Sequence, residues 1–286
     1  MRSWWIAIAF VAALFVSAGA HAAPQRVVSV FLCTDEYVFR LLPRERIAAL
    51  SVLAGDKHPV VSTIADKVQG IALIRPNAED VLSKHPDLVV MYQGTNPRLR
   101  AHLVEAGIPV LEVPWANSLA DVRRVTLLLG EKFGAQNRAA AMLAEMDARL
   151  KTAHEKAQTP PVSTLIYEPN GYITSDGVTE EILGISGLGN AAAKMHPTRL
   201  STLPVEAVVA AAPELLILNN AREGAPAKAD AVLRHPALAS LKDSTLITHA
   251  SLTPLLCPGP WSAEAAEEFT KLGHQARALA RATPRH

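Results

Sequence analysis

The two cysteines of this 286-residue chain are its most reactive side chains. Cys33 could pair with His58 as the nucleophile and base of a secreted enzyme, and Cys257 is an alternative nucleophile. The chain has no Gly-x-Ser-x-Gly turn, no His-Glu-x-x-His pair and no phosphate-binding glycine loop, so no catalytic motif supports this interpretation. An even number of cysteines in an oxidising compartment favours a disulfide, and two separate buried thiols are the alternative. We therefore expect no enzyme activity.

Histidines and a thiolate could instead hold a bare transition-metal ion. His58 and His196 both precede prolines in loops, and His249 and Cys33 complete the set that such a site would use. These four residues have no recognisable metal-ligand spacing, so we expect no directly bound metal and no cofactor.

Aromatic residues are few in this chain, and four of them fall at the ends of predicted strands: Tyr92, Trp115, Tyr167 and Tyr172. An aromatic side chain at a strand end often only covers the core. Together the four favour an apolar cleft with polar groups, which suits a flat or bulky organic ligand. Loop cations would bind carboxylates or an anionic chelate there, with solvated surface charge as the alternative for each: Arg75, Lys194, Arg199 and Arg222.

A pattern of glutamate, short helix, proline and apolar strand occurs twice. Glu79 and Glu206 each begin a predicted helix, and Pro86 and Pro213 each end one seven residues later. A helix dipole favours a carboxylate at either position. A matched pair on two similar halves could also dock onto a two-fold partner that offers arginines. The repeat predicts two similar αβ lobes with a ligand site between them.

Short apolar strands alternate with helices through both halves. The predicted strands are 27–32, 47–53, 88–91, 110–113, 163–167, 215–218 and 246–249. The predicted helices are 37–42, 98–106, 119–130, 136–156, 179–185 and 263–281. This alternation predicts an α/β fold with mostly parallel sheets, in which ligands bind at the carboxyl ends of the strands. The helix over 136–156 would be about 30 Å long and would join the lobes.

The first 22 residues have the pattern of a secretory signal. Arg2 precedes an apolar run from Trp4 to Val16, and Ala20-His21-Ala22 is a cleavage sequence. An uncleaved membrane anchor is the alternative, although the run is short for a bilayer span. The net charge of +1 gives no reason to expect nucleic acid or a membrane surface as a partner. We expect a monomeric periplasmic protein.

The ordered set of these features resembles the periplasmic substrate-binding proteins of ABC importers for cobalamin, ferric siderophores and haem. Its signs are the strand Arg26 to Val30, the segment Glu79 to Val90, the run Gly107 to Val110 and the repeat Glu206 to Leu218. The resemblance implies two αβ lobes joined by one rigid helix and no chemistry. It divides the chain into a signal peptide (1–22), an N-terminal lobe (23–116), a helical linker (117–159) and a C-terminal lobe (160–286).

The resemblance also implies roles for particular residues. Glu79 and Glu206 match the two glutamates that engage arginines of a dimeric membrane permease. A Cys33–Cys257 pair is similar to one found in a branch of the family and would tie the first cleft loop to the last. His58-Pro59 stands where haem and cobalamin binders often have Tyr-Pro, so the resemblance implies only an iron or cobalt chelate. The expected ligand-binding residues are Cys33, Thr34, Asp35, Asp56, His58, Arg75, Tyr92, Gln93, Trp115, Tyr167, Tyr172, Lys194 and Arg222.

Overall fold

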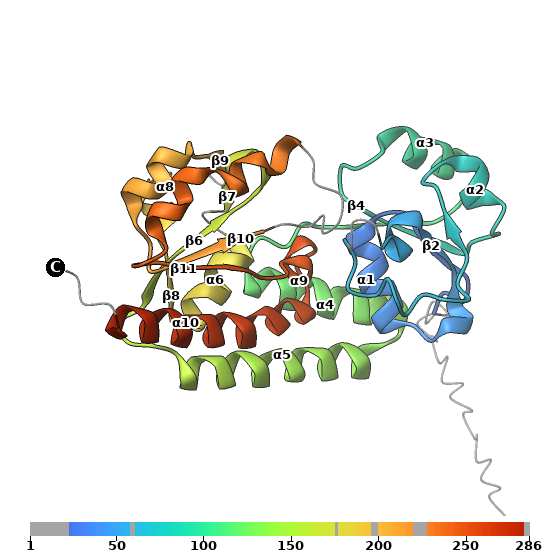
Figure 1. Cartoon of the computed structure of the whole chain (residues 1–286). Coiled ribbons are helices and arrows are strands. Elements are labelled where there is room, and N and C mark those ends of the chain that lie inside the picture. The colour runs from blue at the N-terminus through green and yellow to red at the C-terminus, as the bar shows by residue number, and fades with distance from the viewer. Residues whose placement is uncertain (1–22, 58–60, 175–176, 196–199, 220–227, 283–286) are drawn as a thin grey trace, which may run out of the picture.

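The computed structural model describes residues 23–57, 61–174, 177–195, 200–219 and 228–282. Figure 1 shows two αβ lobes standing on a base of long helices. The predicted signal segment lies outside the described residues. Among the described helices, none is both long and apolar enough to cross a bilayer.

The N-terminal lobe contains a fully parallel five-stranded sheet in the order β3-β2-β1-β4-β5. Its strands are β1 (Val27–Ser29), β2 (Ile47–Ser51), β3 (Leu73–Ile74), β4 (Leu88–Tyr92) and β5 (Val110–Val113). Its helices are α1 (Leu32–Leu41), α2 (Ala78–Leu82) and α3 (Pro97–Glu105), with 3-10 turns η1 (Arg44–Arg46) and η2 (Val52–Gly55). Because the strands are parallel, their carboxyl ends meet at one edge of the sheet.

The C-terminal lobe contains a six-stranded sheet in the order β11-β10-β6-β7-β9, with β8 also paired to β6. Its strands are β6 (Val162–Tyr167), β7 (Tyr172–Thr174), β8 (Leu188–Asn190), β9 (Leu200–Thr202), β10 (Leu215–Leu218) and β11 (Leu246–His249). Its helices and 3-10 turns are η3 (Pro169–Gly171), α6 (Gly177–Ile185), α7 (Ala191–Met195), α8 (Val205–Ala211), η4 (Lys228–Arg234), η5 (Pro236–Leu241), α9 (Thr253–Leu256) and η6 (Pro260–Ala263). β7 runs antiparallel to both of its neighbours, β6 and β9, whereas the other strand pairs of this sheet are parallel. The prediction of a mostly parallel α/β fold is confirmed.

Three helices form the base: α4 (Leu119–Phe133), α5 (Gln136–Lys156) and α10 (Glu264–Ala282). In Figure 1, α5 and α10 run side by side beneath the C-terminal lobe, and α5 continues to α1 of the N-terminal lobe. α5 approaches α4 so closely that a Cβ added at Gly130 would lie 2.6 Å from Ala139 Cβ. One hydrophobic cluster runs from Leu41 of the N-terminal lobe through Met146 of α5 to Phe269 of α10. The lobes therefore share a core at their base.

The repeat predicted from the sequence is also visible in the backbone. His85 and Ala212, each directly before its proline, adopt left-handed φ angles of 49° and 42°. Non-glycine residues rarely adopt this conformation. The matching pair therefore indicates that the two units turn from helix to strand in the same way.

The acidic residue after each proline has the same structural role in both lobes. The carboxylate of Asp87 accepts hydrogen bonds from the backbone N–H groups of Gln25 (2.6 Å) and Arg26 (2.9 Å), just before β1. The carboxylate of Glu214 accepts one from the N–H of Ser163 (3.0 Å), at the start of β6. Each acid thus holds the beginning of the central strand of its own sheet.

The beginning of α1 corrects the prediction. A strand was expected to continue to Leu32 and a helix to begin near Tyr37, but β1 ends at Ser29 and α1 begins at Leu32. The carbonyl oxygen of Phe31 accepts hydrogen bonds from the Asp35 N–H (2.9 Å) and the Thr34 hydroxyl (2.8 Å). These two bonds close the first helical turn earlier than the sequence pattern suggests.

Candidate ligand-binding site

Three aromatic side chains gather at the carboxyl edge of the N-terminal sheet. Phe31 follows β1, Tyr92 ends β4 and Trp115 lies two residues beyond β5. The rings of Tyr92 and Trp115 are stacked, with centroids 4.2 Å apart and planes 13° apart. Phe31 packs edge-on against both, at 5.2 Å from Tyr92 and 5.8 Å from Trp115. We call these three residues the aromatic shelf.

The shelf presents one exposed ring on a fixed support. Tyr92 is only 1% exposed, whereas Trp115 is 47% exposed. The indole N–H of Trp115 donates to the backbone oxygen of Gln93 at 3.2 Å, which fixes the orientation of its ring. An exposed indole whose other contacts are already made is a preformed surface on which a flat ligand could stack.

The predicted contacts Cys33, Thr34 and Asp35 follow Phe31 in the buried first turn of α1. The Thr34 hydroxyl is 2.7 Å from the Ser29 hydroxyl. The Asp35 carboxylate accepts hydrogen bonds from the N–H (3.1 Å) and hydroxyl (2.5 Å) of Ser51. All three side chains are buried, and direct contact of Cys33, Thr34 and Asp35 with a ligand stays a prediction.

Asp35 is an unusual carboxyl group because it is fully buried. Burial disfavours the charged form and is the main reason why the pKa of Asp35 rises to about 7. Hydrogen bonds from Ser29 and Ser51 lower the pKa in part, and the negative charge of the nearby Glu36 raises it. A buried carboxyl group with such a pKa exchanges its proton near neutral pH.

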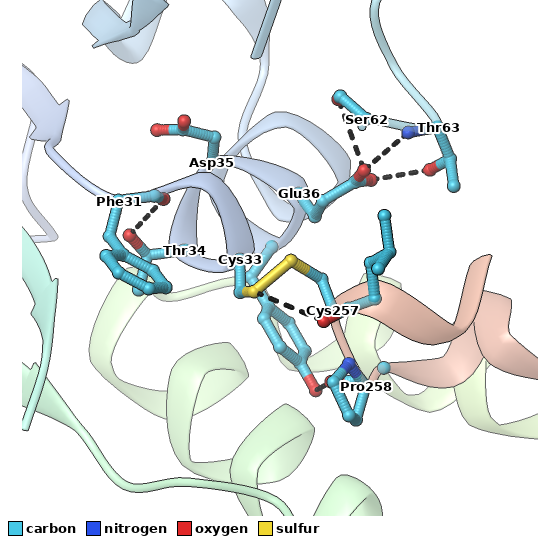
Figure 2. Close-up of a disulfide and its surroundings, with 12 residues drawn as sticks. Phe31, Cys33, Thr34, Asp35, Glu36, Ser62, Thr63, Cys257 and Pro258 are labelled. Carbon is cyan, nitrogen blue, oxygen red and sulfur yellow. Dashed lines mark hydrogen bonds between the residues drawn. A yellow bond between two sulfur atoms is a disulfide. The ribbon is translucent and has the colours of Figure 1, made fainter. Parts of the chain in front are cut away.

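Glu36 holds the other side of α1 in place. Its carboxylate accepts hydrogen bonds from the Ser62 hydroxyl (3.2 Å), the Thr63 N–H (2.7 Å) and the Thr63 hydroxyl (2.6 Å). Arg40, one turn later, donates to the same carboxylate at 2.6 Å. Figure 2 shows Glu36 directed at Ser62 and Thr63.

The predicted disulfide between Cys33 and Cys257 is confirmed. Both residues are buried, and the bond joins α1 to the segment between α9 and η6 of the C-terminal lobe (Figure 2). The sequence contains no other cysteine. Neither sulfur is therefore available as a thiolate, so the enzyme hypothesis loses its nucleophile and the bare-metal hypothesis loses one ligand.

The C-terminal lobe carries a comparable arrangement at the carboxyl edge of its sheet. Tyr167 ends β6, is 0% exposed and donates its hydroxyl to the backbone oxygen of Leu203 at 2.8 Å. Tyr172 lies beyond the turn that follows and is 47% exposed. Asn219, after β10, donates its side-chain amide to the Glu168 carboxylate at 3.0 Å. The exposed ring of Tyr172 is thus the aromatic group that this edge offers to a ligand, and the bond of the buried Asn219 to Glu168 holds the edge in place.

Some of the remaining predicted ligand residues lie in the described part of the structure and others do not. Gln93 and Arg75 are exposed, and Asp56 is half-buried after η2. Lys194 lies in α7, and its side chain is outside the described part. Four residues singled out by the sequence lie outside the described residues: His58, His196, Arg199 and Arg222.

Sequence reasoning did not single out Phe31 or Glu36. Phe31 ends an apolar run, so its ring could not be distinguished from that of a strand residue. Glu36 looked like an ordinary acidic residue near a helix start. An aromatic residue directly before Cys33 and the acidic helix start is the only signal that the sequence offered.

Within the described residues, no group of three His, Cys, Asp or Glu side chains is arranged to hold a metal ion. Two cavities, of about 330 and 570 Å³, lie along the base. Both include Glu145 and Arg149 of α5, and neither is lined by a residue of the shelf. They are grooves beside α5 and α10 with many charged side chains.

The two matched glutamates are both exposed. Glu79 lies in the first turn of α2 and Glu206 in the first turn of α8. In Figure 1, α2 and α8 are on the side of the molecule opposite α5, one on each lobe. Both carboxylates are therefore accessible on the face away from the base.

Comparisons with known proteins agree with this architecture. A curated relative, an uncharacterised ABC transporter substrate-binding lipoprotein YvrC of Bacillus subtilis, is 28% identical over 217 residues, covering 72% of this chain and 66% of that protein. The periplasmic haem-binding protein RhuT of Roseiflexus has a TM-score of 0.68 at 21% identity, covering 91% of this chain and 99% of that one. The vitamin B12-binding protein BtuF of Vibrio cholerae has a TM-score of 0.64 at 14% identity, covering 89% of this chain and 98% of that one.

The Bacillus subtilis relative is named as a substrate-binding lipoprotein of an ABC transporter, and the two solved structures are named for binding haem and vitamin B12; none of the three is named as an enzyme. At such low identity, the two solved structures support only the fold. The sequence itself matches the periplasmic binding protein profile over residues 47–242, more than half of the chain. The chain is a member of the periplasmic binding protein family.

Proposed function

We propose that this protein captures an iron or cobalt chelate between its lobes and delivers it to an ABC permease in the inner membrane. The chelate would be a ferric siderophore, a corrinoid or haem. Support comes from the family, and from two solved relatives of the same fold that are named for binding haem and vitamin B12. The observation that carries the proposal is the exposed, fixed indole of Trp115 on the aromatic shelf.

The chemistry of the two sheet edges suits such a ligand. Trp115 and Tyr172 each offer a half-exposed aromatic ring at the carboxyl end of a sheet, one on each lobe. A porphyrin, a corrin or a catechol ring has a large flat surface that stacks well on such rings. Gln93, which is exposed, adds a polar group for the edge of the ligand.

The first experiment tests ligand capture through Trp115. Purified protein is screened by thermal shift against cyanocobalamin, cobinamide, haemin and a panel of ferric siderophores. A ligand at a hundred times its dissociation constant adds about 2.7 kcal/mol of stability, a shift that is easily measured. Trp115→Ala should weaken binding of the active compound by about tenfold or more, and Trp115→Phe should recover most of the affinity, because it keeps a ring. If Trp115→Ala binds the active compound as tightly as the wild type does, the ligand does not bind at Trp115.

The second experiment tests delivery. We propose that Glu79 and Glu206 dock onto arginines of a dimeric permease, one per lobe. Reversing both charges, with Glu79→Lys and Glu206→Lys, should abolish uptake of the chelate in cells while leaving its affinity for the purified protein unchanged. Glu155→Lys, at an exposed position on the base, is the control. Normal uptake by the double variant would refute the docking assignment.

We also propose that residues 1–22 are removed on export and that the mature monomer, with lobes 23–116 and 160–286 and the linker 117–159, works in the periplasm. The apolar run and the Ala20-His21-Ala22 sequence support this. Amino-terminal sequencing of the exported protein should begin at Ala23, and gel filtration with light scattering should give the mass of one chain.

A further inference from the structure

We propose that the smaller cavity of the base binds a short apolar peptide with free termini, whose carboxylate meets Arg138 and whose ammonium group meets Glu264. Residues of α1, α5, η6 and the start of α10 line this cavity, and no residue of the aromatic shelf does. We call it the base groove. The inference goes beyond the proposed function, because it assigns a second binding site that is separate from the two sheet edges.

The middle of the base groove is apolar. Met142 and Met146 line it from α5, and Pro260 and Trp261 line it from η6. Its volume of about 330 Å³ falls at the lower end of the range for small-molecule sites, which is about 300–1,000 Å³. Methionine side chains adapt their shape to what they pack against. The groove therefore suits a small organic molecule with apolar side chains.

Trp261 gives the groove a fixed aromatic wall. Its ring packs edge-on against Tyr37, with centroids 4.8 Å apart, and the guanidinium carbon of Arg40 lies 4.5 Å above it. Its indole N–H is the one buried side-chain nitrogen or oxygen within the described residues that has no hydrogen-bond partner. Such a donor needs an acceptor, and the backbone of a peptide carries one carbonyl oxygen per residue.

The charged residues around the groove leave one cation and one anion over. Arg40 and Arg149 each donate to a glutamate, at 2.6 and 2.7 Å. Arg138 and Glu264 also line the groove, and neither makes an ion pair or a side-chain hydrogen bond in the part of the chain that the structure describes. Charge complementarity therefore favours a ligand that carries one charge of each sign.

The two free charges lie toward opposite ends of the groove. Arg138 precedes Arg149 by three helical turns of α5, a rise of about 16 Å. The hydrogen bond to Glu145 raises the pKa of Arg149, and the nearby charges of Glu264 and Glu267 raise it further, which places Glu264 toward the Arg149 end. The ends of an extended di- or tripeptide are about 7–10 Å apart. A short peptide therefore fits this separation better than a free amino acid, whose two charges flank a single carbon.

The main test is isothermal titration calorimetry of the purified protein with L-leucine, dileucine and trileucine. We expect saturable binding of the peptides, and binding of leucine that is weaker by about fivefold or more. An exposed ion pair contributes up to about 1 kcal/mol, which corresponds to about fivefold in affinity, and leucine cannot reach both charges. If neither peptide binds, or if leucine binds as tightly as the peptides, the inference is wrong.

Blocked dipeptides test the two ends separately. Acetylating the amino terminus of dileucine, or amidating its carboxyl terminus, should each weaken binding by about fivefold. Arg138→Gln should bind the amide and the free acid equally, and Glu264→Gln should bind the acetylated and the free amine forms equally. Arg98→Gln and Asp243→Asn, at exposed positions elsewhere, should discriminate as the wild type does. Undiminished discrimination in the two groove variants would refute the assigned ends.

Two exposed alanines of α5 provide a matched pair for locating the peptide. Ala141 lines the base groove, whereas Ala148 lines only the neighbouring cavity. Ala141→Leu should fill part of the groove and weaken dileucine binding by about fivefold or more, and Ala148→Leu should leave it unchanged. Both changes retain a strong helix former. Equal effects of the two variants would place the peptide elsewhere.

Trp261 also reports on occupancy directly. Trp115→Phe leaves it as the one tryptophan of residues 23–286. Dileucine should shift the emission of this variant, with the dissociation constant that calorimetry gives, and an unchanged emission at saturation would exclude the base groove. Haemin and cyanocobalamin, the probes of the proposed function, should not compete with dileucine. Loss of chelate binding and loss of peptide binding are thus separate results, and either proposal can fail without the other.

Discussion

The buried carboxyl group of Asp35 gives the clearest prediction for a single residue. Its pKa in the folded protein is about 7, compared with an ordinary value of 3.8. The folded state therefore binds a proton that the unfolded state releases between these two pH values. The stabilisation is complete below about pH 4 and is lost as the pH rises through about 7. One pKa unit corresponds to about 1.4 kcal/mol, so the loss is on the order of a few kcal/mol.

Asp35→Asn should remove this pH dependence, because an amide keeps the hydrogen bonds with Ser51 and does not titrate. Urea unfolding between pH 4.5 and 8 would measure it. The variant should be about as stable as the wild type at low pH and more stable at pH 8. Asp243→Asn, at an exposed site, serves as the control. If the free energy of unfolding changes with pH in the same way for the wild type and for Asp35→Asn, Asp35 is not protonated in the folded state.

Gly171 limits the position of the neighbouring Tyr172. Its φ is 78°, and a Cβ added there would lie 2.7 Å from the backbone oxygen of Leu203. Gly171→Ala should therefore cost about 1–3 kcal/mol, through an unfavourable φ and a clash with the backbone. Gly184, in α6, has open space around its Cβ position, so Gly184→Ala should be neutral or slightly stabilising. Chemical denaturation of both variants tests the contrast, and equal stabilities would contradict it.

The sequence predicts which aromatic residues end strands but not which are exposed. Tyr92 and Tyr167 are the last residues of their strands and point into the packed layer of the lobe, so they are buried. Trp115 lies two residues beyond β5, where the chain has left the sheet, and Tyr172 is the first residue of β7; both are half-exposed. A difference of one or two residues in the position of a strand end therefore decides whether such a ring is buried. Such boundaries are the least certain part of a sequence-based prediction.

At the scale of elements, the sequence predicts the strongly patterned helices and strands correctly but misses the shortest elements. The bounds of α5, β5, β10 and β11 agree with the sequence, because each is a clear apolar or periodic segment with breakers on both sides. The three-residue strands β7 and β9 have no periodicity of their own, and their antiparallel pairing is set by the tertiary structure. The first turn of α1 was missed because backbone hydrogen bonds, and not a capping side chain, begin it.

The acidic residue that follows the proline in each repeat, Asp87 or Glu214, gives a prediction about how the central strands are anchored. Glu214 is half-buried and also pairs with Arg277 at 3.0 Å, whereas Asp87 is exposed. Glu214→Ala should therefore cost about 1–3 kcal/mol, and Asp87→Ala less, about 0.5–1.5 kcal/mol. Because the two sites are in different lobes, their costs should add within about 0.5 kcal/mol. Urea unfolding of both single variants and the double variant would measure this, with Asp243→Ala as the control. A larger cost at Asp87 would contradict the assigned roles.

At the scale of the whole molecule, two lobes could unfold separately or together. Separate units are expected where few contacts cross between them. Here one hydrophobic cluster includes Leu41 of the N-terminal lobe, Leu129 of α4, Met146 of α5 and Ile217 of the C-terminal sheet. The disulfide adds a covalent link between residues 224 positions apart. Because the cluster is shared, unfolding of one lobe would also expose the part of the cluster that belongs to the other lobe.

We therefore expect a single cooperative unfolding transition. Differential scanning calorimetry should give one peak whose calorimetric and van't Hoff enthalpies agree, as for one unit. Cys33→Ala/Cys257→Ala should lower the free energy of unfolding by about 2–5 kcal/mol and should still give one peak, because the shared core remains. Two resolved peaks in the wild type would show that the base helices do not join the lobes energetically. Two peaks only in the cysteine variant would assign the cooperativity to the disulfide and not to the core.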